Sequence, residues 1–178
     1  NHWAQGEKNN LATALMSIEA CNADLLPNSE SLNHLLDNFS IPGRFQVFDY
    51  RIPWILDVAH NPNAAINFRE RLEAIKLPGK NIIIFSLMKD KNLEKFVSLF
   101  EDIIAKWVVC TMDTPRSLSG DEISKRLSEK GLFDVTVLND PDEAFEYIET
   151  INHNYNAVIV TGSFEIVGPC IQWLENKK

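Results

Sequence analysis

Two short stretches of the sequence combine residue types that could bind a phosphate or a carboxylate. The first is DVAHNP, residues 57–62, where an apolar run ends on an acid and an imidazole precedes a helix-like segment. The second is PGRF, residues 42–45, where an arginine follows a turn. A guanidinium can form two parallel hydrogen bonds to such an anion, and the start of a helix stabilises negative charge. Asp57, His60 and Arg44 are therefore candidate ligand-binding residues.

Each of these residues also has a purely structural interpretation. Asn61 and Pro62 are explained by a helix start, because Asn accepts a bond from an unpaired amide and Pro has the backbone angle that the first turn needs. The cap does not require Asp57 or His60, and for them the alternative to ligand binding is a hydrogen-bonded pair that ties down the loop. For Arg44 the alternative is a solvated side chain beside a turn.

The other polar stretches give weaker indications. Ser163 in TGSFEI, residues 161–166, could hold an anion with its own amide at a helix start, or could only cap that helix. Lys89-Asp90-Lys91 and Arg116 fit solvated loops. No GxxxxGK[ST] loop, GxGxxG fingerprint or GxSxG elbow is present, so a triphosphate cradle, NAD binding and a hydrolase nucleophile are not supported. Residue by residue, the chain shows no self-sufficient active site.

The elements that must position these residues alternate between strand and helix. Strand-like apolar runs occupy residues 44–50, 54–59, 81–87, 107–112, 134–138 and 157–162. Helical segments are predicted over residues 7–21, 28–39, 62–75, 93–105, 120–129, 142–151 and 164–175. We therefore predict an α/β fold: a mostly parallel sheet of about six strands with helices on both faces. The first strand, joined by a short turn, is expected to be an antiparallel edge strand.

In such a sheet, ligands bind beyond the carboxyl ends of the strands. The stretches at 57–62, 86–92, 111–117, 138–143 and 161–166 all follow strands, so they should meet at one polar edge.

Composition excludes several classes of function. The chain has 178 residues and a formal net charge of -8, which would repel a nucleic-acid backbone. No run of twenty apolar residues and no signal peptide are visible, so neither a membrane nor secretion is expected. The cysteines and histidines are too scattered for a disulfide framework or a metal site: Cys21, Cys110, Cys170, His2, His34, His60 and His153. We expect a cytoplasmic protein with reduced thiols.

The chain begins Asn1-His2-Trp3 without a methionine. We therefore expect it to be a piece of a longer protein.

The motifs that carry a family resemblance are, in order along the chain, NNLATAL, PGRF, ILDVAHNPNAA, DKN, TPR and VTGSFEIVG. Through them the chain resembles the C-terminal part of the bifunctional folylpolyglutamate synthase/dihydrofolate synthase family, a branch of the Mur ligase superfamily. The resemblance runs from about Asn9 to the end. The combination of PGRF with DVAHNP is its specific part, whereas NNLATAL and GSF are common patterns.

The resemblance implies a division of the chain and an activity. Residues 1–40 would be the helical end of a central ATP-binding domain, and residues 41–178 a Rossmann-like Mur ligase C-terminal domain. Such enzymes use ATP and Mg²⁺ to phosphorylate the acceptor carboxylate of dihydropteroate or a reduced folate, and L-glutamate then attacks the acyl phosphate. The expected partner is the chain's own N-terminal ATPase domain, the expected state is a monomer, and the piece alone is expected to be inactive.

The resemblance also implies roles for individual residues. Asn10 would contact adenine, and Arg44 would reach the nucleotide phosphates after domain closure. Asp57 would lie near the ribose and phosphates, His60 beside the phosphates, and Ser163 near the incoming glutamate. No metal ligand is expected on this chain, because the phosphate loop, the magnesium ligands and the carbamylated lysine of the family belong to the part that precedes it.

Two other functions remain open at this point. One is another Mur-type ligase that joins an amino acid to a different acceptor. The other is a non-enzymatic α/β module that binds an anionic small molecule.

Overall fold

The structure, a computed structural model, describes residues 4–77, 79–151 and 154–177, so His2 and His153 lie outside the described residues. Residues 41–177, here called the α/β domain, contain one sheet with the strand order β1-β2-β6-β3-β4-β5. The strands are β1 (Gln46–Tyr50), β2 (Ile52–Asp57), β3 (Asn81–Phe85), β4 (Ile104–Cys110), β5 (Val135–Leu138) and β6 (Val158–Thr161). All pairs are parallel except β1 with β2. The predicted sheet with its antiparallel edge strand is confirmed.

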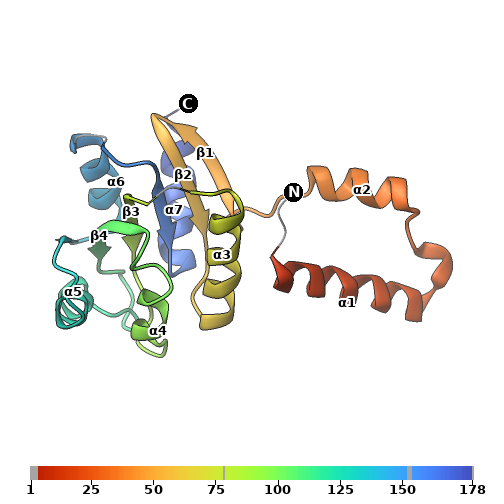
Figure 1. Cartoon of the computed structure of the whole chain (residues 1–178), viewed down its shortest axis with the longest axis horizontal. Coiled ribbons are helices and arrows are strands. Elements are labelled where there is room, and N and C mark those ends of the chain that lie inside the picture. Colours follow the sequence, from red (N-terminus) through yellow and green to blue (C-terminus); the bar gives the residue numbers. More distant parts are fainter. Residues whose placement is uncertain (1–3, 78, 152–153, 178) are drawn as a thin grey trace.

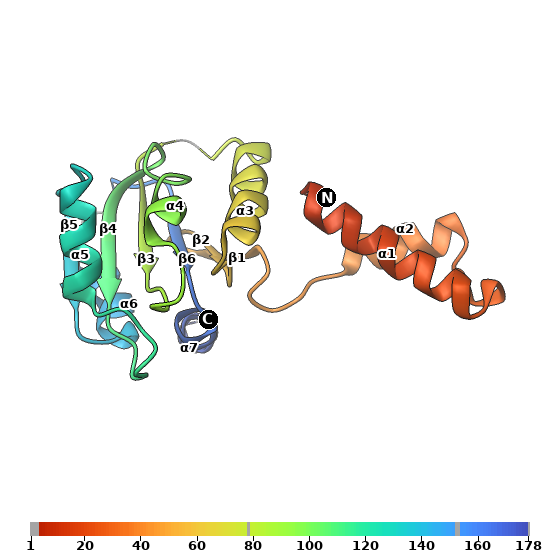
Figure 2. The same ribbon diagram turned by 90° about the horizontal axis from the view of Figure 1, so that it is seen from below.

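Helices cover both faces of this sheet (Figures 1 and 2). One face carries α3 (Pro62–Ala74), α4 (Leu93–Val97) and α5 (Gly120–Glu129), and the other carries α6 (Pro141–Thr150) and α7 (Phe164–Glu175). All five residues of β3 are buried, as expected for a strand that is covered on both sides.

The helix after β2 begins as the sequence predicts. Asn61 Oδ1 accepts a hydrogen bond from the Ala64 amide at 3.0 Å, and Pro62 is the first helical residue. The cap satisfies an amide that has no partner inside the helix. It also fixes the point at which the chain turns away from the sheet edge.

The predicted helix over residues 93–105 is wrong in its length, because α4 ends at Val97 and β4 begins at Ile104. At this point the chain joins the sheet through hydrogen bonds to β3. The backbone and side-chain amides of Asn81 both donate to the Ile103 carbonyl, at 3.2 and 3.0 Å. These tertiary bonds outweigh the local helical preference, which the sequence pattern alone reports.

Residues 4–40, here called the helical segment, form α1 (Gln5–Cys21), the short 3₁₀ helix η1 (Ala23–Leu25) and α2 (Ser29–Asn38). Both views show these helices standing away from the α/β domain (Figures 1 and 2). No residue of α1 is buried. The helical segment therefore lacks a core of its own in this chain.

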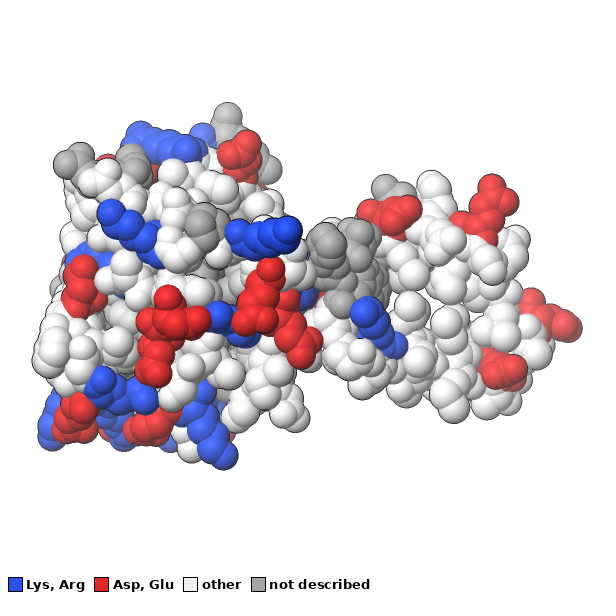
Figure 3. Space-filling view, in the orientation of Figure 1, with Lys and Arg blue, Asp and Glu red and all other residues white. Residues whose placement is uncertain are grey.

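On the face drawn in Figure 3, acidic and basic side chains are interspersed over the α/β domain, whereas the charged side chains visible on the helical segment are mostly acidic. Its exposed apolar side chains are Met16, Ile18, Leu25, Leu26, Leu35 and Phe39. No helix among the described residues is both long enough and apolar enough to span a membrane.

Candidate functional site

The strand order makes neighbouring connections diverge at the carboxyl edge of the sheet. β6 lies between β2 and β3; the chain leaves β2 toward α3 on one face and leaves β6 toward α7 on the opposite face. Ligands of open α/β sheets bind where neighbouring connections diverge in this way. The loops that carry Asp57, His60 and Ser163 meet at this divergence.

Gly162 brings these loops into close contact. It has φ +106°, and a Cβ placed on it would lie 2.0 Å from the Ser86 carbonyl oxygen. Only glycine fits such a conformation and such an approach. Next to it, Thr161 Oγ1 donates to the Ala59 carbonyl at 3.3 Å. The loops after β2, β3 and β6 are thus held together at one edge.

Asp57 ends β2 with its carboxylate turned toward the backbone. Oδ2 accepts the Phe45 amide and Oδ1 accepts the Ala59 amide, each at 2.9 Å. The residue is 7% exposed. Burial raises the pKa of its carboxyl to about 6, against the two amide bonds and the charges of Arg44 and Arg71, which lower it. Asp57 therefore ties the loop that carries Arg44 to the end of the central strand.

Arg44 and His60 both approach the exposed ring of Phe164. The guanidinium carbon of Arg44 lies 6.0 Å from the ring centroid, and the His60 and Phe164 ring centroids are also 6.0 Å apart. Phe164 is 60% exposed. His60 Nδ1 lies 2.8 Å from the Val58 carbonyl, so this nitrogen carries a proton and donates. In the neutral ring Nε2 is then an acceptor, and in the charged ring it is a second donor.

Ser163 is the N-cap of α7, which has 12 residues. Its Oγ accepts the Glu165 amide at 3.1 Å. The structural role that the sequence allowed for Ser163 is present. The cap also places the positive end of the α7 dipole directly before Phe164, so the edge combines a guanidinium, an imidazole and a helix start.

Asn10 is not brought to this edge by any contact among the described residues; it is exposed on α1.

The two loops that carry Lys89 and Arg116 are hydrogen-bonded to each other. The Lys89 amide donates to the Arg116 carbonyl and Lys89 Nζ to the Pro115 carbonyl, both at 2.8 Å.

Sequence reasoning missed three residues of this edge. Phe164 directly follows the N-cap Ser163, so its place at the start of a helix could be read from the sequence, but its exposure could not. Gly162 carried a signal, since a glycine between a strand and a helix indicates a special backbone conformation. Phe45, whose amide binds Asp57, carried none that could be read locally.

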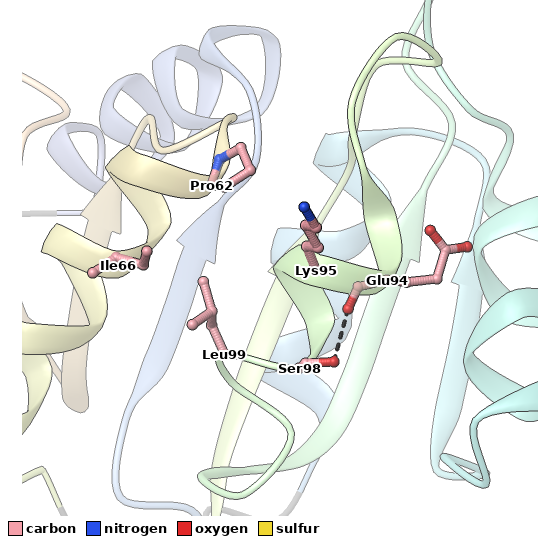
Figure 4. Close-up of a pocket in the computed structure, with 6 residues that line it drawn as sticks. All are labelled: Pro62, Ile66, Glu94, Lys95, Ser98 and Leu99. Atoms are coloured by element: carbon pink, nitrogen blue, oxygen red, sulfur yellow. Dashed lines mark hydrogen bonds between the residues drawn. The ribbon is translucent and has the colours of Figure 1, made fainter.

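A pocket lies elsewhere, between α3 and α4 (Figure 4). It has a volume of about 360 Å³ and is lined by Pro62, Ile66, Glu94, Lys95, Ser98 and Leu99. Its walls are mainly apolar, and Ser98 Oγ is already bonded to the Glu94 carbonyl at 2.9 Å. None of the predicted site residues lines it.

The strand order and the helices on both faces define an open, doubly wound α/β domain. A family model described as Mur ligase, glutamate ligase domain matches residues 43–164. Since this is more than half of the chain, the protein belongs to that family.

Relatives and solved structures agree with this membership. The chain is 30% identical over 155 residues to the dihydrofolate synthase/folylpolyglutamate synthase of Buchnera aphidicola subsp. Schizaphis graminum, covering 87% of this chain and 36% of that protein. The bifunctional enzyme of Yersinia pestis, complexed with AMPPNP and Mn ion, has a TM-score of 0.73 and 28% identity, covering 85% of this chain and 36% of that chain. The folylpolyglutamate synthase of Mycobacterium tuberculosis complexed with ADP has a TM-score of 0.83 at 19% identity, covering 97% and 40%; at that identity the likeness shows the fold alone. The chain thus spans well under half the length of these proteins.

Proposed function

We propose that the chain is the C-terminal portion of an ATP-dependent ligase that adds L-glutamate to dihydropteroate, to reduced folates, or to both. The acceptor carboxylate is first phosphorylated by ATP, and the glutamate amine then displaces phosphate from the acyl phosphate. The observation that carries this proposal is the grouping of Arg44, His60 and the Ser163 helix start at the divergence point of a Mur ligase glutamate ligase domain.

The groups at this edge suit the stabilisation of phosphate charge. Arg44 is exposed and free to turn toward a ligand, and His60 with both ring nitrogens protonated can donate from Nε2 to a phosphate oxygen while Nδ1 donates to the Val58 carbonyl. Asp57, with both oxygens bonded to amides, acts by holding the Arg44 loop. Charge stabilisation and positioning suffice for phosphoryl transfer, in which little covalent chemistry falls to the protein.

The residues of this chain do not fit a magnesium site. Within the described ranges, no group of three or more His, Cys, Asp or Glu side chains could hold a metal ion. Any Mg²⁺ used with ATP would be held by another part of the full-length protein. Asn10 is proposed to contact adenine from α1, and Ser163 to approach the incoming glutamate.

We further propose that residues 1–40 are the end of an ATP-binding domain and residues 41–178 the closing domain. The apolar side chains of α1 and α2 that find no cover here would pack inside that larger domain. Alone, this chain should not catalyse the reaction.

A substrate panel with the full-length protein tests the proposal. ATP, Mg²⁺ and L-glutamate are supplied with dihydropteroate, with a reduced folate, or with a cell-wall nucleotide precursor, and products are identified by mass. Glutamyl products from the first two acceptors support the proposal. Product only from the third assigns another Mur-type ligase. No ATP-dependent product with any acceptor leaves a module that binds an anionic small molecule and overturns the ligase assignment.

A further inference from the structure

The contact between α1 and α3 is made by polar and charged groups. Arg71 Nη1 of α3 lies 2.7 Å from Glu7 Oε1 of α1. The Gln5 amide donates to Glu70 Oε2 at 3.3 Å. Gly6 lies so close to Asn67 that an added Cβ would be 2.1 Å from its Nδ2. Because α1 buries no residue, little apolar area resists its separation from α3, and the contact is releasable.

Glu7 organises both sides of this contact. Its Oε2 accepts the Ala4 amide at 2.8 Å and so caps the first turn of α1, while Oε1 pairs with Arg71. One carboxylate therefore fixes the start of α1 and joins it to α3.

Arg71 extends the contact to the loop that carries Arg44. Its guanidinium carbon lies 4.0 Å from the centroid of the Phe45 ring, and its side chain is 23% exposed. Among the described residues its buried Nε has no hydrogen-bond partner. Stacking on the ring, together with the Glu7 pair, therefore holds this guanidinium in place.

Phe45 in turn determines the course of the loop. It is a non-glycine residue at φ +44°, a conformation that persists only where the surroundings impose it. Those surroundings are the Arg71 guanidinium, the Phe68 ring at 5.8 Å and the bond from its amide to Asp57. Arg44 directly precedes Phe45, so its placement beside Phe164 depends on these contacts.

We propose that Arg71 is a positioning residue that couples the docking of α1 on α3 to the placement of Arg44. While Glu7 pairs with Arg71, the guanidinium lies flat on Phe45 and the Phe45–Asp57 bond holds the loop. When α1 leaves α3, Arg71 loses its partner and the loop loosens. What Arg44 then does rests on the proposed function, whereas the coupling is a property of this chain.

Spin labels on the chain itself test the docking half of the proposal. Cys21 at the end of α1 is exposed and Cys110 and Cys170 are buried, so a label on Cys21 and on an added Ile75→Cys reports the α1–α3 arrangement. Electron–electron distance measurements should give one narrow distribution for the parent chain and broad ones for Arg71→Met and Glu7→Gln. The matched control is Arg69→Met. Arg69 lies on the same helix as Arg71, and its loss removes an ion pair to Asp102 without touching α1. Identical distributions in all four proteins would overturn the proposal.

Hydrogen exchange at the Phe45 amide tests the other half. Arg71→Met and Glu7→Gln should accelerate exchange by about tenfold through loss of the restraint on the loop, and Arg69→Met should not. Unchanged exchange in Glu7→Gln, an isosteric substitution at a half-buried position that is expected to fold, would refute the coupling even if Arg71→Met fails to fold.

Turnover of the full-length protein completes the test. Arg71→Met should lower kcat by about tenfold to a hundredfold with little change in the KM of the acceptor, as expected for a misplaced catalytic group, and Arg71→Lys should restore part of it. Normal turnover of Arg71→Met would contradict the positioning role. If the parent protein ligates no glutamate but the labels and the exchange respond to Arg71, the proposed function fails and the coupling stands.

Discussion

The sheet and the N-terminal helices of this protein are held by different forces. Every residue of β3 is buried, whereas α1 buries none of its 17 residues. The α/β domain is held by two apolar cores, and the helical segment meets it through the Glu7–Arg71 pair and a few polar contacts. One part is a rigid support for the carboxyl edge of the sheet, and the other exposes apolar side chains that lack cover.

The largest expected effect lies in the rigid part, at Gly162. Gly162→Ala should destabilise the 178-residue chain by about 3 to 5 kcal/mol, because the new Cβ would meet the Ser86 carbonyl and the residue would be forced to a positive φ. Urea denaturation measures this change. The control is Gly168→Ala in α7, where an added Cβ meets no atom within 4 Å, so stability should change by less than about 1 kcal/mol. Equal effects at the two glycines would show that the loops are not as closely packed as described.

Arg44→Ala should reduce turnover of the full-length protein about a hundredfold, since a group that stabilises transferring phosphate charge is lost. Steady-state kinetics measure it, with the denaturation midpoint unchanged because Arg44 is exposed. Arg126→Ala on α5 removes a guanidinium that is paired with Glu122, and it should leave turnover unaffected. A variant at position 44 with normal rates would remove this arginine from the site.

The pKa of Asp57 makes the stability of the α/β domain depend on pH. The carboxyl rises from 3.8 to about 6 on folding, so the folded state binds its proton more tightly than the unfolded state does. The stability that this group contributes is full below about pH 4 and is lost as pH rises through about 6. The loss amounts to about 2 to 3 kcal/mol.

The difference in unfolding free energy between the parent chain and Asp57→Asn isolates this contribution. Measured in urea from pH 4 to pH 7, the parent should lose stability relative to the variant as pH rises. A constant difference would mean that Asp57 titrates normally. In the full-length protein both Asp57→Asn and His60→Ala should impair the proposed turnover while the protein stays folded.

The smallest effect is expected from removing the helical segment. Residues 41–178 alone should unfold within about 1 kcal/mol of the longer chain, because the α1–α3 contact is polar and α1 buries no residue. The shorter chain should also bind less of an apolar fluorescent dye, since Met16, Leu25 and Leu35 are gone. Loss of folding on removal would place these helices inside the domain rather than beside it.

The sequence predicted the sheet well because its signals were local and strong. Continuous apolar runs marked β3 and β6, and α5 spans the predicted residues 120–129, where Ser119 caps it and Gly131 follows it at φ +83°. The prediction of where α4 ends was wrong because the end depends on Asn81, which lies at the start of another strand and bonds to the Ile103 carbonyl. Tertiary bonds of this kind leave no periodic trace.

The site was predicted unevenly for the same reason. His60 and Ser163 follow strands and stand at helix starts, so their position at the sheet edge followed from topology. Arg44 precedes β1, and its position at this edge was not predicted from the sheet. The contact of Arg71 with Phe45 joins residues that are far apart in sequence, and neither residue type indicates such a contact. Asp57 could be placed at the edge from the sequence, but that its two oxygens bind backbone amides could not.

The most direct test of the account is to follow oxygen from the acceptor into phosphate. The full-length protein is supplied with ATP, Mg²⁺, L-glutamate and dihydropteroate labelled with ¹⁸O in its carboxylate, and the released phosphate is analysed by mass. The acyl-phosphate route predicts a glutamylated product and phosphate that carries one ¹⁸O, because the acyl phosphate forms through a carboxylate oxygen. Product with unlabelled phosphate would contradict the acyl-phosphate route, and no product would contradict the ligase assignment itself.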